Sequence, residues 1–342
     1  MISAESSNRV LTTTRYKLLP KVVDSVLRSN VFATRMLGAA KKFSGYSMKF
    51  PFKWQTNNQF SSFDGFDTLS TTAVDTRINL EFFPSFMQIP VSLPLTELAK
   101  NQTEEGVMDL MALEMKSSSQ DMADAIGTLF YLDGTGNSGK DPLGLAAIVD
   151  DGTSVATYGG QSRATYPTLD ATKTASGGTL TLAKMATLYN AITDGSVKPS
   201  VGIATKTVWS LYEQLLQPQE RIMKDVGLIK GGMKSGTGYT ALDYKGFPIL
   251  SDNKCTTGNL YFLNEDFLNW YALPMPNTEP VKYKSVDIEG NDYSNVLGLG
   301  FSWIDWVRPV NAAALVGRVV LGGQLLSEDP LRQGVLTGIT GV

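Results

Sequence analysis

The sequence predicts an α+β protein, and three observations support this prediction. Residues 46–82 contain two segments in which polar and apolar side chains alternate, which is typical of β-strands. Residues 95–131 carry the strongest helical periodicity in the chain. Beyond residue 178, short helical and strand patterns follow one another. A length of 342 residues with 42% hydrophobic side chains is sufficient for about two domains and a substantial core.

The chain contains no histidine and a single cysteine, Cys255. Without imidazole, a Ser/His/Asp triad, a Cys/His dyad and a histidine-based zinc helix are excluded. One thiol cannot close an intrachain disulfide or form a thiolate metal site. We therefore expect no catalytic residues, no cofactor and no metal. Neither a signal peptide nor a long apolar run is visible, so we expect a protein made and kept in a cytoplasm.

The net charge of −3 hides a strong asymmetry. Residues 1–60 hold ten Lys and Arg against two acidic residues, a net charge of +8, which leaves −11 for the rest of the chain. A basic terminal segment on an acidic body indicates contact with an anionic partner, either nucleic acid or the body of a neighbouring copy. A solvated terminus without a partner is the alternative, because these charges are spread out.

In the N-terminal part of the chain, the sequence predicts elements that have few neighbouring segments to pack against. Residues 1–16 are polar and predict an extended arm, and residues 18–27 predict a short amphipathic helix. Residues 47–54 and 73–82 alternate polar and apolar side chains and predict the two strands of a hairpin.

The loop between these strands carries three phenylalanines, Phe60, Phe63 and Phe66, around a turn at Asp64 and Gly65. A two-stranded ribbon is not stable on its own, and exposed aromatic side chains favour burial. We therefore expect the hairpin to lie on another subunit. The alternative is that it joins a sheet of its own chain.

The long helix is predicted within residues 95–131, where Thr103 is a suitable N-cap followed by Glu104 and Glu105. About 28 residues with a rise of 1.5 Å each give a length of about 40 Å, more than the width of a small domain. We expect its apolar face to fill a core and not to bind a ligand. That face comprises Val107, Met111, Met115, Met122, Ile126 and Phe130.

Residues 134–140 match the Gly-rich pattern of a phosphate-binding loop, and an acidic pair follows at Asp150 and Asp151. Such a loop follows a strand and opens a helix so that its amides face the phosphates, but here a helix precedes it. Asp141 also stands where a hydroxyl would hold magnesium, and Pro142 follows at once. A turn that ends the helix is the preferred interpretation. A nucleotide-hydrolysing enzyme is the alternative from another functional class.

The second half of the chain predicts alternating helices and strands after a Gly-, Ser- and Thr-rich loop at residues 152–178. One helix is expected from a Thr181 cap to Ile192 and another over residues 207–216. A second Gly-rich loop covers residues 227–238. Strands are expected at residues 201–204, 244–250, 260–263, 270–273, 281–288, 296–306 and 313–321.

Three stretches are informative in combination: residues 130–136 with 142–145 at the end of the long helix, residues 244–252 with 258–267, and residues 301–323. In this order they resemble the spine helix and its turn, the paired axial-domain strands and the late peripheral-domain strands of one family. That family is the major capsid proteins of tailed bacteriophages, which have the Hong Kong 97 phage-like capsid fold. None of these stretches is a catalytic signature.

The resemblance covers most of the chain and implies five segments. These are an N-arm (1–45), an extended E-loop hairpin (46–92), a peripheral domain with the spine helix (93–150), an axial domain (151–294), and a return to the peripheral domain with the C-terminus (295–342). The implied function is a major capsid protein that self-assembles into the icosahedral head shell around double-stranded DNA and is not an enzyme. An encapsulin-like nanocompartment shell is the alternative within this fold.

The resemblance also implies where copies touch. The expected intersubunit contacts are Arg9, Arg15, Lys17, Lys21, Arg28 and Arg35 of the N-arm, and Trp54, Phe60, Phe63 and Phe66 of the E-loop. The implied partners are copies of the chain in hexamers and pentamers, a portal protein at one vertex, decoration proteins and packaged DNA bound non-specifically, with no membrane. The hairpin begins near Tyr46, which leaves no room for a long scaffolding segment, so we expect a separate scaffold protein. The implied location is the virion, after assembly in the bacterial host cytoplasm.

Overall fold

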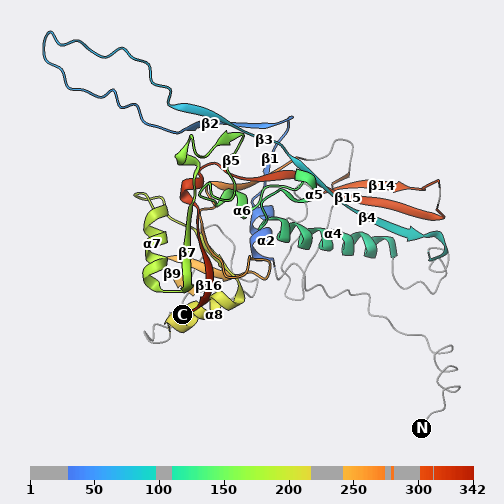
Figure 1. The fold of residues 1–342 in the computed structure, drawn as a ribbon. Coiled ribbons are helices and arrows are strands. Elements are labelled where there is room, and N and C mark those ends of the chain that lie inside the picture. Colours follow the sequence, from blue (N-terminus) through green and yellow to red (C-terminus); the bar gives the residue numbers. More distant parts are fainter. Residues whose placement is uncertain (1–29, 98–109, 217–241, 274–278, 281–300, 311) are drawn as a thin grey trace.

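A computed structural model of the chain describes residues 30–97, 110–216, 242–273, 279–280, 301–310 and 312–342. This part of the chain forms two six-stranded sheets with their helices, one projecting hairpin, and a short two-stranded ribbon in which β5 (Thr157–Tyr158) pairs antiparallel with β6 (Gln161–Ser162) (Figure 1). Several predicted features lie outside the described residues. They are the helix at 18–27, Val107, the Gly-rich loop at 227–238 and the strand at 281–288.

The first sheet is built around β15 (Ala314–Ser327), the longest strand of the described residues. β15 pairs antiparallel with β12 (Leu268–Ala272), β14 (Phe301–Val307) and β4 (Ser85–Pro94). Two-residue strands, β1 (Lys41–Lys42) and β13 (Glu279–Pro280), complete the sheet. The helix α4 (Leu110–Leu129) runs along β4 and β15 (Figure 1). Its 20 described residues span about 30 Å.

The second sheet also has six strands and carries two helices, α7 (Leu182–Ile192) and α8 (Lys206–Leu216). The prediction that α7 begins at Thr181 is confirmed, because the Thr181 hydroxyl accepts a 3.2 Å hydrogen bond from the Lys184 amide. Both helices pack apolar side chains against the sheet. The strands in spatial order are β7 (Thr172–Thr179), β16 (Gly334–Gly341), β11 (Leu260–Leu263), β8 (Val201–Ala204), β10 (Phe247–Ser251) and β9 (Leu242–Tyr244).

Short elements connect these two sheets. They are α2 (Val31–Gly38), α5 (Gly136–Gly139), α6 (Leu145–Ile148), β5 (Thr157–Tyr158), β6 (Gln161–Ser162) and the 3₁₀ turns η2 (Pro167–Leu169) and η4 (Pro330–Arg332). One apolar core extends from α2 and α4 through the first sheet, and a second lies between α7, α8 and the second sheet. Among the described residues, we find no helix with the length and hydropathy needed to cross a membrane.

The prediction of a long loop at residues 152–178 is wrong, because β5, β6 and most of β7 lie there. β7 is an edge strand that pairs in parallel with β16, so its backbone holds it in the sheet although its side chains are small. The two sheets take strands from more than one of the predicted ranges, and the division into domains stays a prediction. β12 lies in the first sheet although it belongs to range 151–294, and β16 lies in the second sheet although it belongs to range 295–342.

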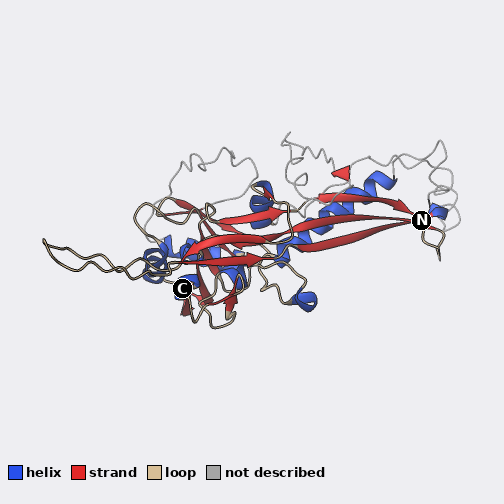
Figure 2. Cartoon of the chain, turned by 90° about the horizontal axis from the view of Figure 1, so that it is seen from above, coloured by secondary structure: helices blue, strands red, loops and turns tan. Residues whose placement is uncertain are grey.

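The predicted hairpin is formed by β2 (Met48–Lys53) and β3 (Arg77–Phe82), which pair antiparallel as a separate two-stranded sheet. Residues 54–76 continue beyond these strands as a long loop. Figures 1 and 2 both show this loop projecting well beyond the rest of the described residues. We call β2, β3 and residues 54–76 the arm.

Candidate assembly surface

The strands β2 and β3 form the root of the arm, and they pack against the rest of their own chain. One face of the hairpin is apolar, and Met48, Leu80 and Phe82 are buried in the core. The Phe82 ring lies 5.1 Å from the ring of Tyr158, between ring centroids, and the Glu81 amide donates a 2.9 Å hydrogen bond to the carbonyl of Gly159. The hairpin therefore packs on its own chain at its root, but it forms a separate two-stranded sheet and does not join either six-stranded sheet.

The loop continues the ribbon beyond the strands. The Trp54 amide donates to the Thr76 carbonyl at 3.1 Å, and the Gln55 side-chain amide donates to the Asp75 carbonyl at 2.6 Å. Further out, the Ser70 hydroxyl is 2.6 Å from the side-chain oxygen of Gln59. The chain turns where the Asp67 amide donates to the Asp64 carbonyl at 3.1 Å. These bonds between the two limbs hold the arm in an extended form.

The outer part of the arm has no cover from its own chain. Every residue from 56 to 73 is exposed. Phe60 is 92% exposed, Phe63 is 65% exposed and Phe66 is fully exposed. Large exposed aromatic side chains that gather in one place mark an interaction surface. We call these three residues the tip phenylalanines.

Trp54 differs from the tip phenylalanines. It is half-buried, and its ring lies 5.1 Å from that of Tyr166 in the same chain. We predicted Trp54 as an intersubunit contact, which stays a prediction, and the structure shows a contact of its ring within its own chain. The reason is its position directly after β2, where the ribbon still lies against the body.

α2 lies within the predicted N-arm and is fixed by polar contacts with other elements. The Phe32 amide in the first turn donates to the Asp252 carboxylate at 2.9 Å, so an aspartate after β10 caps this helix. Arg35 forms two hydrogen bonds with Glu265, at 2.7 and 2.6 Å. Burial raises the pKa of Asp252, although the two amides that donate to it oppose the shift.

Arg35 was predicted to contact another subunit, and this stays a prediction; within its own chain the side chain already has a partner. Its guanidinium is occupied by Glu265 of the same chain in a bidentate pair, which leaves both side chains mostly buried. The five other predicted N-arm contacts lie outside the described residues. They are Arg9, Arg15, Lys17, Lys21 and Arg28.

The C-terminal part of α4 and Phe130, which directly follows it, fill the core. Met122, Ile126 and Phe130 are buried. The Phe130 ring packs between Phe32 of α2, at 5.8 Å, and Trp270 of β12, at 5.2 Å between ring centroids. Met111 and Met115 belong to α4, but their side-chain surroundings lie outside the described part of the chain.

The Gly-rich segment 134–140 forms a turn after α4, not a loop between a strand and a helix. Asn137 and Ser138 have positive φ angles of 50° and 61°, so the four residues of α5 do not present regular helical amides. The Asp150 carboxylate, which could have served a metal, accepts hydrogen bonds from the Lys173 ammonium at 2.7 Å and from backbone amides including Val155 at 2.8 Å. These contacts favour the helix-ending turn over nucleotide binding.

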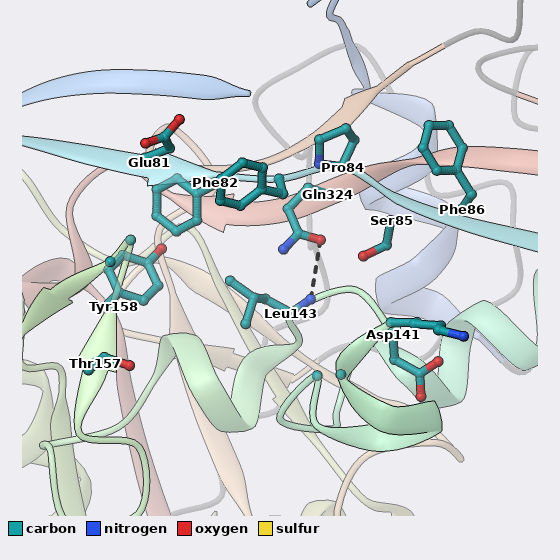
Figure 3. A pocket seen from close by; sticks show the side chains of 16 residues that line it. Glu81, Phe82, Pro84, Ser85, Phe86, Asp141, Leu143, Thr157, Tyr158 and Gln324 are labelled. Atoms are coloured by element: carbon teal, nitrogen blue, oxygen red, sulfur yellow. Dashed lines mark hydrogen bonds between the residues drawn. The ribbon is translucent and has the colours of Figure 1, made fainter. Parts of the chain in front are cut away.

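This turn borders a cavity of about 510 Å³ at the arm root (Figure 3). Phe82, Pro84, Phe86 and Leu143 provide apolar walls, and the Leu143 amide donates to the Gln324 side chain at 3.3 Å. Among the described residues, we find no group of three or more acidic or cysteine side chains placed to hold a metal ion. The cavity is thus lined by apolar side chains together with the charged side chains of Lys140 and Asp141.

The sequence did not identify the residues that anchor the arm and α2. Tyr158, Tyr166, Asp252 and Glu265 are distant in sequence from the elements that they hold. A Gly-Gly pair beside a tyrosine at residues 158–160 was the only local signal of a close approach.

No family model and no curated protein sequence matches the chain. Solved structures do match it along nearly its whole length. The capsid of cyanophage A-1(L) has a TM-score of 0.72 and 16% identity, over 97% of this chain and 99% of that chain. The capsid of a native GTA particle has a TM-score of 0.60 and 11% identity, over 98% and 97% of the two chains. The SrpI encapsulin complex from Synechococcus elongatus has a TM-score of 0.57 and 12% identity, over 97% and 95%.

These similarities establish the class of fold. The chain has the Hong Kong 97-type capsid fold, with mixed helices and sheets, as the sequence predicted. The identities are too low to carry more than the fold, so the function is argued separately.

Proposed function

We propose that this chain is the major capsid protein of a tailed bacteriophage, which self-assembles into an icosahedral head shell around double-stranded DNA. The observation that carries the proposal is the similarity to the cyanophage A-1(L) capsid over 97% of the chain. The exposed tip phenylalanines support it, because a protruding aromatic tip gains stability only when a neighbour covers it. In this proposal the protein acts through contacts between copies and not through catalysis.

The predicted domains and partners form part of the proposal. In this proposal residues 1–45 are the N-arm, residues 46–92 the E-loop, residues 93–150 the peripheral domain with the spine helix, residues 151–294 the axial domain, and residues 295–342 the return to the peripheral domain with the C-terminus. Copies gather into hexamers and pentamers, with a portal protein at one vertex. A separate scaffold protein acts during assembly in the host cytoplasm, and decoration proteins and non-specifically bound DNA are partners in the virion.

Electron microscopy of the purified full chain, combined with sedimentation, tests the proposal. We expect closed shells that sediment far faster than a 37.1 kDa protomer. If the protein stays monomeric at all concentrations and ionic strengths, also with scaffold-containing lysate, the proposal is wrong.

An encapsulin-like shell is the second candidate, and the similarity to the SrpI complex favours considering it. The two candidates differ in what the shell encloses. Shells isolated from the cells that naturally make the protein would hold nuclease-protected double-stranded DNA in the first case and a protein cargo in the second. We expect DNA.

A further inference from the structure

The chain passes between the two sheets along two neighbouring segments. Residues 264–267 lead from β11 in the second sheet to β12 in the first, and residues 328–333 lead from β15 in the first sheet back to β16 in the second. β12 pairs antiparallel with β15, and β11 pairs antiparallel with β16. One antiparallel ribbon therefore runs through both sheets. We call residues 264–267 and 328–333 its joint.

The joint interrupts the regular backbone pairing of this ribbon. The pairing of β12 with β15 begins at Leu268 and Ser327, and the pairing of β11 with β16 ends at Phe262 and Gly334. Between these pairs, one limb contains the 3₁₀ turn η4, which has no counterpart in the other limb. A backbone hydrogen bond of 2.8 Å from the Glu328 amide to the Phe267 carbonyl links the two limbs at one end of the joint.

The side chain of Gln333 replaces backbone pairing at the other end of the joint. Its oxygen accepts a 3.0 Å hydrogen bond from the Asn264 amide, and its nitrogen donates at 3.0 Å to the Asn264 carbonyl. The same nitrogen lies 3.4 Å from the Ser327 hydroxyl. Gln333 and Ser327 are 0% exposed and Asn264 is 2% exposed. The buried amide of Gln333 thus exchanges both hydrogen bonds with Asn264, as a facing residue does in an antiparallel ladder.

Further hydrogen bonds connect the joint to both sheets. The Asn264 side chain donates at 3.0 Å to the carbonyl of Lys198, which precedes β8 in the second sheet. At the end of β15 in the first sheet, the Tyr158 hydroxyl donates to the Ser327 carbonyl at 2.9 Å and accepts from the Ser327 amide at 2.8 Å. The polar groups of the joint are therefore paired with fixed partners on both sides.

The helix α2 adds a second attachment. Its Arg35 forms the bidentate pair with Glu265, which directly follows Asn264 in the joint. The Ser200 hydroxyl donates to the Glu265 carboxylate at 3.1 Å and accepts from the Glu265 amide at 3.1 Å. α2 itself packs against α4 and β12. Arg35 therefore ties the joint to elements that lie on the first sheet.

We propose that the joint is a lock that sets the angle between the two sheets, with Gln333 as its central residue. A different angle would separate Gln333 from Asn264 and leave buried polar groups without partners, which is costly inside a protein. Apolar packing is non-directional and selects an angle less sharply.

The consequence of the lock rests on the proposed function, because the angle within each copy contributes to the curvature of a shell. A fixed angle gives shells of uniform diameter. The differences between pentamers and hexamers then fall on contacts between copies and not on the joint.

Gln333→Met tests the lock in the protomer, because methionine has a similar volume but lacks the amide. Spin labels on Glu213→Cys in α8 and Arg318→Cys in β15 report the distance between the sheets; both positions are exposed, and the natural Cys255 is buried. We expect one narrow distance distribution without the methionine and a broader one with it. Hydrogen exchange at the Asn264 amide is expected to become about tenfold faster.

Gln324→Met is the matched control, since it also removes a buried glutamine. The Gln324 side chain accepts its hydrogen bond from Leu143, in the turn after α4, so this change leaves the bonds of the joint intact. We expect an unchanged distance distribution, and an equal broadening in both variants overturns the lock. If Gln333→Met does not fold, Glu265→Gln carries the test through the Arg35 pair, and an unchanged distribution in that variant overturns the lock.

Electron micrographs of assembled protein separate the lock from the proposed function. We expect shells of one diameter from the natural protein and from Gln324→Met, and mixed diameters with open fragments from Gln333→Met. Uniform shells and an unchanged distance distribution in Gln333→Met overturn the lock and leave the proposed function standing. A broadened distribution with uniform shells overturns its role in curvature. A broadened distribution in a protein that never assembles supports the lock and overturns the proposed function.

Discussion

Replacing Gly159 by alanine tests how closely the arm root is attached to its own chain. Gly159 has a φ angle of +55°, and a Cβ atom there would lie 2.8 Å from Leu80 Cβ and 3.0 Å from Phe82 Cζ. A left-handed alanine costs about 1–2 kcal/mol, and overpacking a core adds about 1–3 kcal/mol. Gly160→Ala is a matched control, since its φ angle is +77° but no heavy atom lies within 4 Å of the added Cβ.

The assay is urea unfolding of the protomer at concentrations below assembly. We expect Gly159→Ala to lower the free energy of unfolding by about 2–5 kcal/mol and Gly160→Ala by only about 1–2 kcal/mol. The difference measures the close approach of β3 to the β5–β6 ribbon. Equal losses in the two variants would show that the arm root is not packed against Gly159.

Three further predictions concern the tip phenylalanines, the buried Asp150 carboxylate and the Gly-rich turn. Replacing the tip phenylalanines by serine is expected to lower shell yield strongly in electron micrographs while the protomer melting temperature stays within about 2 °C; a loss of melting temperature without a loss of shells would contradict it. Burial acts to raise the pKa of Asp150, but Lys173 and the backbone amides outweigh it and lower that pKa. Its stabilising contribution is therefore present above the unfolded pKa of about 3.9 and is lost as the pH falls through the lower folded value. In urea unfolding at pH 7 to 2, Asp150→Asn should be less stable at pH 7 and approach the natural protein below about pH 4; a constant difference would refute the assignment. Lys140→Ala is expected to leave shell assembly intact, and magnesium-dependent ATP hydrolysis that disappears with this change would instead support a nucleotide site.

Elements with strong local patterns were predictable from the sequence. The alternating patterns predicted β2 and β3, and the Thr181 cap predicted the start of α7. The predicted strand at residues 260–263 coincides with β11. In each case the signal is contained within about ten residues, so the local sequence suffices.

Elements defined by distant pairing were missed. β4 contains Pro90 and Pro94, which weaken a strand prediction, yet it pairs along β15 from Ser85 to Pro94. β16 contains three glycines and is held between β7 and β11 by backbone hydrogen bonds. α2 was also missed, because its N-terminal cap is Asp252, more than two hundred residues away.

The sequence predicted the aromatic character of the arm's loop, but it did not predict how the arm and α2 are held to the rest of the chain. The tip phenylalanines stood out as aromatic residues in a polar loop, and the structure leaves them exposed. The intrachain contacts of Trp54 with Tyr166 and of Arg35 with Glu265 were not predicted, because both partners belong to remote elements. Such contacts depend on tertiary packing that no local pattern encodes.

A three-dimensional cryo-electron microscopy reconstruction of the purified, assembled protein tests the proposed shell and the contacts of the arm most directly. We expect a closed icosahedral shell in which every arm crosses to a neighbouring copy and its tip lies on that copy. Particles without closed symmetry, or a shell in which each arm folds back on its own chain, would contradict it.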